Sequence, residues 1–409
     1  MKFSEHVKLL ERDNIIVLVN TCTRNWYKMS KEIFNILNYG IERNFDCNEL
    51  LAAIHDEEDR EIIYKVINNL RKKSIVLDEH DKEPADERNF TVAITDRCNL
   101  ACKHCSYNAK LYRSTAEKCT YEQLKKRLSK ILLLNPTTIA FTGGEPMVRD
   151  DFIKLSQWLR TKFDGQLFLM TNGTLITEEN VKSITEIFSQ IDISIDGVDE
   201  NTCSQIRGAG VFSKVVKSVE LLQKNGFTKI SLSMVDTHVT HRFVKEFFSL
   251  NKRLKTRPIL RSFSEVGRGK INKEQFLLRQ QDYSETSNVL SEEFRTNYQK
   301  NFKASGCGAG KGVFFVDYDG SVYGCATLRE LGYKLGDIEQ IETCIDSANN
   351  KIYKEMIGNI PDKCRACDVN IFCIECLADF LNVDDKGTDF KKFCCERKRC
   401  LEDIIWKKR

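Results

Sequence analysis

The chain contains 409 residues, with 63 basic and 59 acidic side chains and a formal net charge of +4 at pH 7. Domains usually contain roughly 100 to 200 residues, so this length predicts two or three domains and allows a large enzyme. The charges are interspersed and nearly balanced, which argues against nucleic acid or an anionic membrane as a partner. The first residues lack the apolar core of a signal peptide, and no window approaches the roughly 20 apolar residues of a membrane span. We therefore expect a cytoplasmic protein.

Residues 1–86 begin with two strand-like runs in "NIIVLVNTCTRNWYKMS", separated by a turn at "TCTRN". Three amphipathic helical stretches follow, because apolar residues recur at spacings of three and four. They cover residues 30–42, 47–56 and 59–79. Ser30 is suited to cap the first helix, and "SIVL" after the last helix is suited to a wing strand. This order fits a winged helix-turn-helix fold.

Strand and helix patterns alternate after a polar linker at residues 78–89. The expected strands cover residues 90–95, 138–144, 166–174, 191–197, 229–237 and 256–264. The expected helices between them cover residues 149–163, 178–188 and 212–226. This repetition is typical of a parallel sheet wrapped by helices.

The regular pattern fades from about Ser305, and the density of cysteines rises. Nine of the seventeen cysteines fall between Cys325 and Cys400 inclusive. In a long cytosolic chain, reducing conditions favour metal ligation over disulfides. We therefore expect metal sites to hold the C-terminal region together.

Three cysteines stand close together in "DRCNLACKHCS", at Cys98, Cys102 and Cys105. A structural zinc site normally has four protein ligands, so three cysteines leave one coordination position empty. An iron–sulfur cluster held by three thiolates has the same property, because one iron is free to bind another molecule. The missing ligand therefore predicts a binding position for a substrate or cofactor.

The spacing CxxxCxxC directly after the first strand of the expected parallel sheet resembles the signature of radical S-adenosylmethionine (radical SAM) enzymes. The resemblance implies that Cys98, Cys102 and Cys105 hold a [4Fe–4S] cluster whose fourth iron chelates SAM. It also implies that one electron cleaves SAM to methionine and a 5′-deoxyadenosyl radical. His104 stands where the family commonly has an aromatic residue. For this motif alone, three incidental thiols are the alternative.

A glycine-rich loop follows the next predicted strand. "TGGEP" contains Gly143, Gly144, Glu145 and Pro146 and resembles the family loop that meets the amino group of SAM. Glycines permit a close backbone approach, and the Glu145 carboxylate can accept from an ammonium group. Taken alone, the same segment reads as an ordinary turn at the end of a strand.

Two polar segments, "TNGT" at residues 171–174 and "SIDG" at residues 194–197, end the following strands. They lie at the rim where barrel enzymes place their sites. "RGAGVF", beginning at Arg207, resembles the family segment whose arginine pairs with the SAM carboxylate. The residues expected at the cofactor are therefore Asn172, Ser194, Asp196 and Arg207.

The C-terminal cysteines resemble the SPASM extension of radical SAM enzymes. The family pattern CX9-15GX4C fits Cys307, Gly320 and Cys325. The family pattern CX2CX5CX3C then fits with one departure, since Cys373 and Cys376 are separated by two residues where the family has three. This departure leaves the ligand role of Cys376 open.

The SPASM resemblance implies two auxiliary [4Fe–4S] clusters. The ligands of one would be Cys364, Cys367, Cys373 and Cys394, with Cys395 as a rival for the last position. The ligands of the other would be Cys307, Cys325 and Cys376. Since no cysteine lies between Cys203 and Cys307, this second cluster would keep an open iron for a substrate thiolate.

The cysteines allow an alternative to the auxiliary clusters, and six of them have no expected ligand role. "CRAC" and "CIEC" together offer four thiolates, so a zinc ribbon is the alternative to the auxiliary clusters. Six cysteines outside the motifs are expected to be buried or incidental thiols: Cys22, Cys47, Cys119, Cys203, Cys344 and Cys400.

The N-terminal region resembles the RiPP recognition element, a winged helix-turn-helix that captures the leader of a ribosomally made precursor peptide. The resemblance implies that the leader adds as a strand beside the small sheet, against the last helix. A DNA-binding winged helix and a docking module without ligand are the alternatives. Basic residues at Lys28, Lys31 and 71–73 are offset by acidic residues 56–59, which counts against DNA.

Together these resemblances cover essentially the whole chain and predict three domains. They are a recognition element at residues 1–86, a partial (β/α)6 TIM-type barrel at residues 87–300 and a SPASM domain at residues 301–409. The implied function is a maturase that takes hydrogen from a peptide Cα or Cβ and forms cysteine thioether crosslinks, as in sactipeptide and ranthipeptide synthases. The alternatives are a carbon–carbon crosslinking cyclase, a formylglycine-generating dehydrogenase and a non-enzymatic metal-stabilised adaptor. The expected partners are the precursor peptide and an electron donor such as flavodoxin or ferredoxin.

Overall fold

The structure is a computed structural model that describes residues 1–84, 87–113, 115–279, 282, 302–373, 376, 394, 398–399 and 401–407. The chain divides into two compact units. The barrel unit contains Glu87–Phe294 and Gly308–Lys354. The terminal unit joins Met1–Asp86 with Arg295–Cys307 and Glu355–Arg409. Among the described residues, no helix is both long and apolar enough to cross a membrane.

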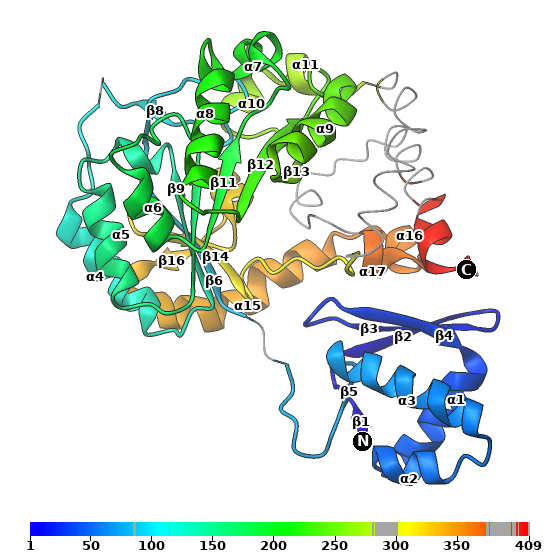
Figure 1. The fold of residues 1–409 in the computed structure, drawn as a ribbon. Coiled ribbons are helices and arrows are strands. Elements are labelled where there is room, and N and C mark those ends of the chain that lie inside the picture. Colours follow the sequence, from blue (N-terminus) through cyan, green and yellow to red (C-terminus); the bar gives the residue numbers. More distant parts are fainter. Residues whose placement is uncertain are drawn as a thin grey trace. The chain divides into compact units, whose positions relative to one another are not determined.

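A sheet of nine strands forms the centre of the barrel unit (Figure 1). Six neighbouring strands are parallel and run in the spatial order β13-β12-β11-β10-β9-β6. Their bounds are β6 Asn89–Thr95, β9 Thr138–Gly143, β10 Gln166–Thr171, β11 Gln190–Ser194, β12 Ile230–Asp236 and β13 Arg257–Ser262. These strands confirm the six that the sequence predicts between residues 90 and 264.

Helices lie along one face of these parallel strands (Figure 1). Their bounds are α4 Tyr121–Leu132, α5 Phe152–Arg160, α6 Val181–Ile187, α7 Glu200–Arg207, α8 Val211–Lys224 and α9 Val244–Leu254. Apolar strand residues such as Phe141, Leu169 and Ile193 pack with these helices in one core. Removal of this apolar surface from water stabilises the layered arrangement.

The other face of the parallel strands carries buried polar side chains. Asp192, Ser231 and Ser233 are buried and alternate along their strands with the core residues Ile193 and Leu232. Alternate residues of a strand point to opposite faces, so these polar groups point away from the helices. This face therefore offers hydrogen-bonding groups to a polar ligand.

Three further strands extend the sheet beyond β6. β14 (Val313–Val316) pairs with β6 in parallel, and β15 (Ser321–Tyr323) and β16 (Lys334–Asp337) follow as antiparallel neighbours. These strands were not predicted, because runs of three or four residues are too short to show a period. They carry the segment before and around Cys325 into the barrel sheet.

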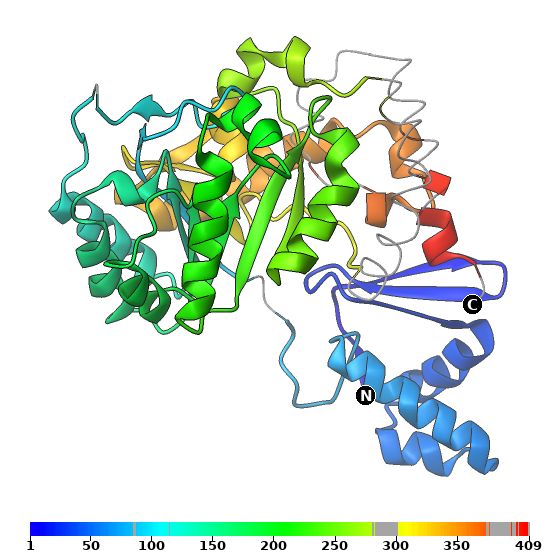
Figure 2. The same ribbon diagram turned by 45° about the horizontal axis from the view of Figure 1, so that its top comes forward.

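The N-terminal part of the terminal unit has a three-stranded antiparallel sheet with helices on one side (Figures 1 and 2). The elements are β1 Lys2–Phe3, β2 Val7–Arg12, β3 Ile15–Asn20, β4 Trp26–Ser30, α1 Lys31–Glu42, α2 Cys47–Ala52, α3 Glu57–Lys72 and β5 Val76–Leu77. The Ser30 side chain accepts from Ile33 N and so caps α1, as the sequence predicts. β5 pairs with β1 outside the three-stranded sheet.

The other side of this small sheet packs against C-terminal segments of the same unit. Val17 and Val19 share a buried cluster with Phe372 and Ile405. Trp26 Nε1 donates to Phe302 O at 2.7 Å. Further elements of the C-terminal segment of this unit are α16 Asp362–Arg365 and α17 Asn370–Cys373, whereas most of α15 (Ile341–Gly358) belongs to the barrel unit. The N-terminal sheet and the C-terminal cysteine segment therefore share one apolar core.

Candidate functional site

The loop with the CxxxCxxC motif follows β6 at the carboxyl edge of the parallel sheet. Its beginning forms β7 (Arg97–Cys98), which pairs in parallel with β8 (Lys110–Leu111) and closes the loop. Cys98 and Cys102 are buried and Cys105 is half-buried. We call residues 96–111 the cluster loop.

The three thiols of the cluster loop lie close enough to act on one another electrostatically. Burial raises the pKa of the Cys98 thiol to about 12, and the neighbouring Cys102 and Cys105 contribute in the same direction. Burial also raises the pKa of the Cys102 thiol, although the nearby Arg207 opposes this. The Cys98 and Cys102 thiols are therefore protonated at neutral pH when free, and a metal centre must displace their protons.

The "TGGEP" loop at the end of β9 packs directly against the start of the cluster loop. Gly144 N donates to Thr95 O at 2.9 Å, and Glu145 N donates to Arg97 O at 2.8 Å. A Cβ at Gly143 or Gly144 would collide with these same carbonyl oxygens, and Gly143 has a φ of 127°. Glycine is therefore required by the close approach of two backbone segments.

Glu145 ties this loop to the end of β10. Its buried carboxylate accepts from Thr171 Oγ1 at 2.7 Å and from Asn172 N at 2.7 Å. It also accepts at 3.2 Å from Met147 N in the 3-10 helix η1 (Pro146–Val148). Burial raises the pKa of Glu145 against the effect of these hydrogen bonds. Glu145 thus organises the rim, and its contact with a SAM ammonium group stays a prediction.

Asn172 joins the end of β10 to the cluster loop. Its Nδ2 donates to Asn99 Oδ1 at 2.8 Å and lies 3.8 Å from Cys98 Sγ. Asn99 Nδ2 in turn donates to Thr174 Oγ1 at 2.8 Å. The "TNGT" segment and the cluster loop therefore form one hydrogen-bonded network.

A buried ion-pair group connects the end of β11 to the cluster loop. Arg207 NH2 lies 2.5 Å and His104 Nε2 lies 2.7 Å from the same oxygen, Asp196 Oδ2. Although burial alone would raise it, the charge of Arg207 and the contact with His104 lower the pKa of Asp196 below its usual range. Arg207 NH1 lies 3.8 Å from Cys102 Sγ. Residues predicted from "SIDG" and "RGAGVF" thus meet a predicted cluster ligand.

These residues fit the predicted cluster and SAM. Thiolates are the usual ligands of iron–sulfur clusters, and the cluster loop carries three cysteines whose thiols influence one another electrostatically. Arg207 Nε is buried and has no hydrogen-bond partner among the described residues. An unsatisfied buried N–H is costly, and a ligand carboxylate would satisfy it. Ser194, at the same rim, is half-buried and its Oγ lies 3.4 Å from Ser233 Oγ.

A clamp over the cluster loop was not predicted from the sequence. Arg268, in the helix α10 (Gly267–Ile271), donates from N, Nε and NH1 to three carbonyl oxygens of the loop. These acceptors are Cys105 O at 2.9 Å, Cys102 O at 2.9 Å and Ala109 O at 2.6 Å. Because the acceptors are backbone carbonyls, the residue types of the loop do not indicate the clamp. The available signal was the pair of glycines in "VGRGK", which follows β13.

A second unpredicted connection joins the cluster loop to the Cys325 segment. Tyr107 OH donates to Asp317 Oδ1 at 2.5 Å, directly after β14. Arg329 Nε donates to Asp317 Oδ2 at 2.6 Å from the helix α14 (Ala326–Glu330), which begins after Cys325. Burial raises the pKa of the Tyr107 hydroxyl above its usual value, so this group is a proton donor.

Three of the C-terminal cysteines lie near one another in the terminal unit. Burial raises the pKa of the Cys364 thiol, and the neighbouring thiols of Cys394 and Cys367 contribute. Cys373 ends α17 and packs at the edge of the apolar core there. Cys395, the rival of Cys394, lies outside the described residues. A cluster held by Cys364, Cys367, Cys373 and Cys394 stays a prediction.

The other predicted auxiliary ligands are divided between the two units. Cys325 belongs to the barrel unit, whereas Cys307 and Cys376 belong to the terminal unit. A cluster that they share therefore stays a prediction.

Most cysteines outside the motifs are buried, as the sequence predicts. The buried ones are Cys47, Cys119, Cys203 and Cys344, and Cys22 is half-buried. Cys400 lies outside the described residues.

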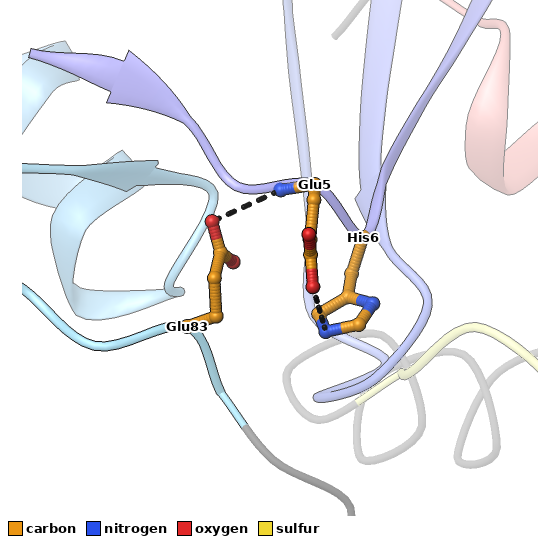
Figure 3. A group of neighbouring side chains, drawn as sticks. All are labelled: Glu5, His6 and Glu83. Carbon is orange, nitrogen blue, oxygen red and sulfur yellow. Dashed lines mark hydrogen bonds and ion pairs between the residues drawn. The ribbon is translucent and has the colours of Figure 1, made fainter.

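Glu5, His6 and Glu83 form a separate group at the surface of the terminal unit (Figure 3). Potential ligand atoms of the three side chains lie within 4.8 Å of one another. Glu5 N donates to Glu83 Oε1 at 3.2 Å, and Ser4 Oγ donates to Glu83 Oε2 at 2.7 Å. These contacts fasten the start of the linker to the N-terminal domain.

Comparison with known proteins shows one matching family. The model of the radical SAM superfamily matches residues 92–249, which contain the cluster loop and the strands β9 to β12.

Two curated proteins are similar to larger parts of the chain. The mycofactocin maturase MftC of Mycolicibacterium smegmatis is 29% identical over 263 residues, which are 58% of this chain and only 63% of MftC. The antilisterial bacteriocin subtilosin biosynthesis protein AlbA of Bacillus subtilis is 23% identical over 385 residues, which are 87% of this chain and 84% of AlbA.

Two solved structures share the fold. Streptococcus suis SuiB bound to the precursor peptide SuiA has a TM-score of 0.54 at 14% identity and covers 94% of this chain and 97% of its own. Native anSMEcpe with bound AdoMet and Cp18Cys peptide has a TM-score of 0.60 at 21% identity and covers 78% of this chain and 96% of its own. At these identities the likeness establishes the fold alone.

Proposed function

We propose that this chain is a radical SAM enzyme that matures a ribosomally synthesised precursor peptide, because the model of that superfamily matches residues 92–249. The observation that carries this proposal is that the cluster loop, with its three cysteines, is hydrogen-bonded to the ends of β9, β10 and β11 at one rim. Similarity to peptide maturases over most of the chain supports the choice of substrate. The proposed products are thioether crosslinks between cysteine sulfur and a peptide carbon.

The residues at the rim have distinct proposed roles. Cys98, Cys102 and Cys105 would hold the [4Fe–4S] cluster, and the unsatisfied Nε of Arg207 would donate to the carboxylate of SAM. When bound, the cluster and SAM supply a 5′-deoxyadenosyl radical that removes hydrogen from a peptide Cα or Cβ. Glu145 and Asn172 hold the rim loops in place relative to one another through their hydrogen bonds. The buried polar side chains Asp192, Ser231 and Ser233 would offer hydrogen-bonding groups to the cofactor.

The terminal unit has the proposed task of holding the peptide. Its N-terminal part has a three-stranded sheet (β2, β3 and β4) followed by the helices α1, α2 and α3 and the short strand β5, and this order supports the assignment to a RiPP recognition element. We assign the leader peptide to the edge of this sheet, where backbone hydrogen bonds give affinity. The C-terminal cysteines would bind two auxiliary [4Fe–4S] clusters, and the one near Cys307 would take the substrate thiolate or the surplus electron. Flavodoxin or ferredoxin would supply the reducing electron.

Co-expression with a candidate precursor peptide tests this function. Each thioether removes two hydrogen atoms from the peptide and one thiol from the pool that iodoacetamide can alkylate. We expect both losses with the intact enzyme and neither with a Cys98→Ala variant. An unchanged peptide mass beside an enzyme that cleaves SAM would contradict the proposal.

The same experiment separates the alternative products. A carbon–carbon crosslink also removes two hydrogen atoms, but it leaves every cysteine open to alkylation. Formylglycine replaces a side chain with an aldehyde, which a hydrazide reagent captures. A Cys307→Ala variant is expected to cleave SAM without forming the thioether, because the auxiliary cluster acts on the substrate.

A further inference from the structure

We infer that Asp196 is a positioning residue that holds the Arg207 guanidinium against the Cys102 thiolate of the SAM cluster. His104, in the cluster loop, binds the same carboxylate oxygen and completes the group. The inference rests on the cluster proposed at Cys98, Cys102 and Cys105 and is independent of the peptide substrate. It gives Asp196 a task other than contact with SAM.

The Asp196 carboxylate is fixed from three sides. Oδ2 binds Arg207 NH2 and His104 Nε2, and Oδ1 accepts from Val235 N at 2.6 Å. A carboxylate can only accept, so each of these neighbours donates to it. The Asp196 side chain has no solvent exposure, and its contacts join β11, β12 and the cluster loop. A side chain held in this way has little freedom to turn toward a ligand.

His104 anchors the loop at the position before the third cysteine. Its side chain is buried, and its ring lies 5.7 Å from the ring of Phe276 in the helix α11 (Lys273–Phe276). A phenylalanine here could pack on Phe276 but could not donate to Asp196. The histidine therefore replaces the common aromatic side chain with one that both packs and donates.

Arg207 connects Asp196 to the predicted cluster ligand Cys102. Its NH1 lies 3.8 Å from Cys102 Sγ, while its NH2 is held by Asp196. A guanidinium keeps its positive charge in proteins, and the Asp196 carboxylate compensates that charge in the buried site. Hydrogen bonds to cluster sulfurs and nearby charge set the reduction potential of an iron–sulfur cluster. A cation at Cys102 stabilises the reduced cluster, which is the more negative form.

Arginine beside a different cysteine provides a matched control. Arg127 NH1 lies 3.0 Å from Cys119 Sγ, and Cys119 is a buried thiol outside the predicted cluster. Arg127→Gln removes the same kind of contact together with hydrogen bonds to Tyr318 O and Asp319 O, and all of these partners lie outside the cluster loop. It should leave every property of the SAM cluster unchanged.

Pulsed electron paramagnetic resonance on the intact protein tests the contact directly. The chain is labelled with ¹⁵N-arginine, reconstituted and reduced without SAM, and the SAM-cluster signal is identified as the one missing from a Cys98→Ala variant. We expect a ¹⁵N coupling to this signal that disappears in Arg207→Lys and weakens in Asp196→Asn. Absence of the coupling in the labelled wild-type protein would overturn the inference, whether or not any variant folds.

The midpoint potential of the same cluster is a second test of the inference. Arg207→Gln is expected to shift the potential to a more negative value, because the reduced cluster loses its neighbouring cation. If a fully iron-loaded Arg207→Gln protein had the same midpoint potential as the wild type, the proposed role of Asp196 and Arg207 would be refuted. Neither measurement uses SAM or peptide, so failure of peptide modification with the coupling intact would refute the proposed function and leave this inference standing.

Discussion

At the scale of single residues, Gly144 is one of two neighbouring positions where the backbone of the site allows no side chain. A Cβ there would collide with Arg97 O, which cannot move without opening the cluster loop. We expect Gly144→Ala to lower the free energy of unfolding by more than about 3 kcal/mol, above the usual cost of an overpacked core. Urea unfolding and the iron content of the reconstituted protein measure this.

A second glycine serves as the control for this prediction. Gly226 has a φ of 80° but no atom within 4 Å of an added Cβ. Gly226→Ala should therefore cost only about 1 kcal/mol of backbone strain and retain full iron. Equal losses at Gly144 and Gly226 would mean that the collision has no special cost.

His241 is predicted to make the stability of the barrel depend on pH. Its Nδ1 lies 2.8 Å from Asp236 Oδ1 in a buried pair at the end of β12. Although burial alone would lower it, Asp236 raises the pKa of His241 above its ordinary value of about 6.5. A raised pKa stabilises the folded state below about pH 6.5, and this contribution is lost as the pH rises through the folded value.

The comparison of wild type with His241→Gln checks this sign. The difference in the free energy of unfolding should be larger at about pH 6 than at about pH 9. A difference that grows toward alkaline pH would contradict the assigned pair.

Much of the site at this scale could be predicted, because its residues lie in short motifs. The motifs indicated that Cys98, Glu145 and Asp196 belong to one rim, since each follows the end of a parallel strand. They did not indicate that Glu145 binds backbone and hydroxyl donors or that Asp196 binds His104. These contacts depend on the strand order in space, which a linear pattern does not contain.

At the scale of elements, α10 is predicted to hold the cluster loop closed. Arg268→Gln removes two charged donors from the loop carbonyls of Cys102 and Ala109. Hydrogen bonds from charged groups contribute about 1.5–3 kcal/mol each, so we expect a loss of about 3 kcal/mol. Urea unfolding and the rate of iron loss to a chelator check this.

Lys270 on the same helix is exposed and provides the control. Lys270→Gln should change the free energy of unfolding by less than about 0.5 kcal/mol. An Arg268→Gln variant that loses iron no faster than Lys270→Gln would show that the clamp is unimportant.

Long periodic elements could be predicted, and short ones could not. The six parallel strands and the helices α5, α6 and α8 have clear periods of two or 3.6 residues. By contrast, β14 is defined by its pairing with β6, more than two hundred residues earlier in the chain. Pairing over such a sequence distance leaves no local signal.

At the scale of the whole molecule, the N-terminal sheet and the C-terminal cysteine segment are predicted to fold together. Trp26 contacts the rings of Phe302 and Phe372 at centroid distances of 6.1 and 5.3 Å. Phe372 directly precedes the predicted ligand Cys373. Trp26→Ala should destabilise the terminal unit by about 3 kcal/mol and reduce the iron bound per chain.

Leu9 lies on the same sheet but is 44% exposed. Leu9→Ala should therefore change stability by less than about 0.5 kcal/mol and leave the iron content unchanged. If Trp26→Ala behaved like Leu9→Ala, the shared core would have no role in forming the auxiliary sites.

Reductive cleavage of SAM tests the central claim most directly, because it requires the cluster, the SAM site and the rim together. The full chain is reconstituted anaerobically and incubated with SAM and a reductant, and 5′-deoxyadenosine is measured. We predict that the wild-type protein forms 5′-deoxyadenosine and that a variant with alanine at Cys98, Cys102 and Cys105 forms none. A fully iron-loaded wild-type protein that forms no 5′-deoxyadenosine would contradict the account.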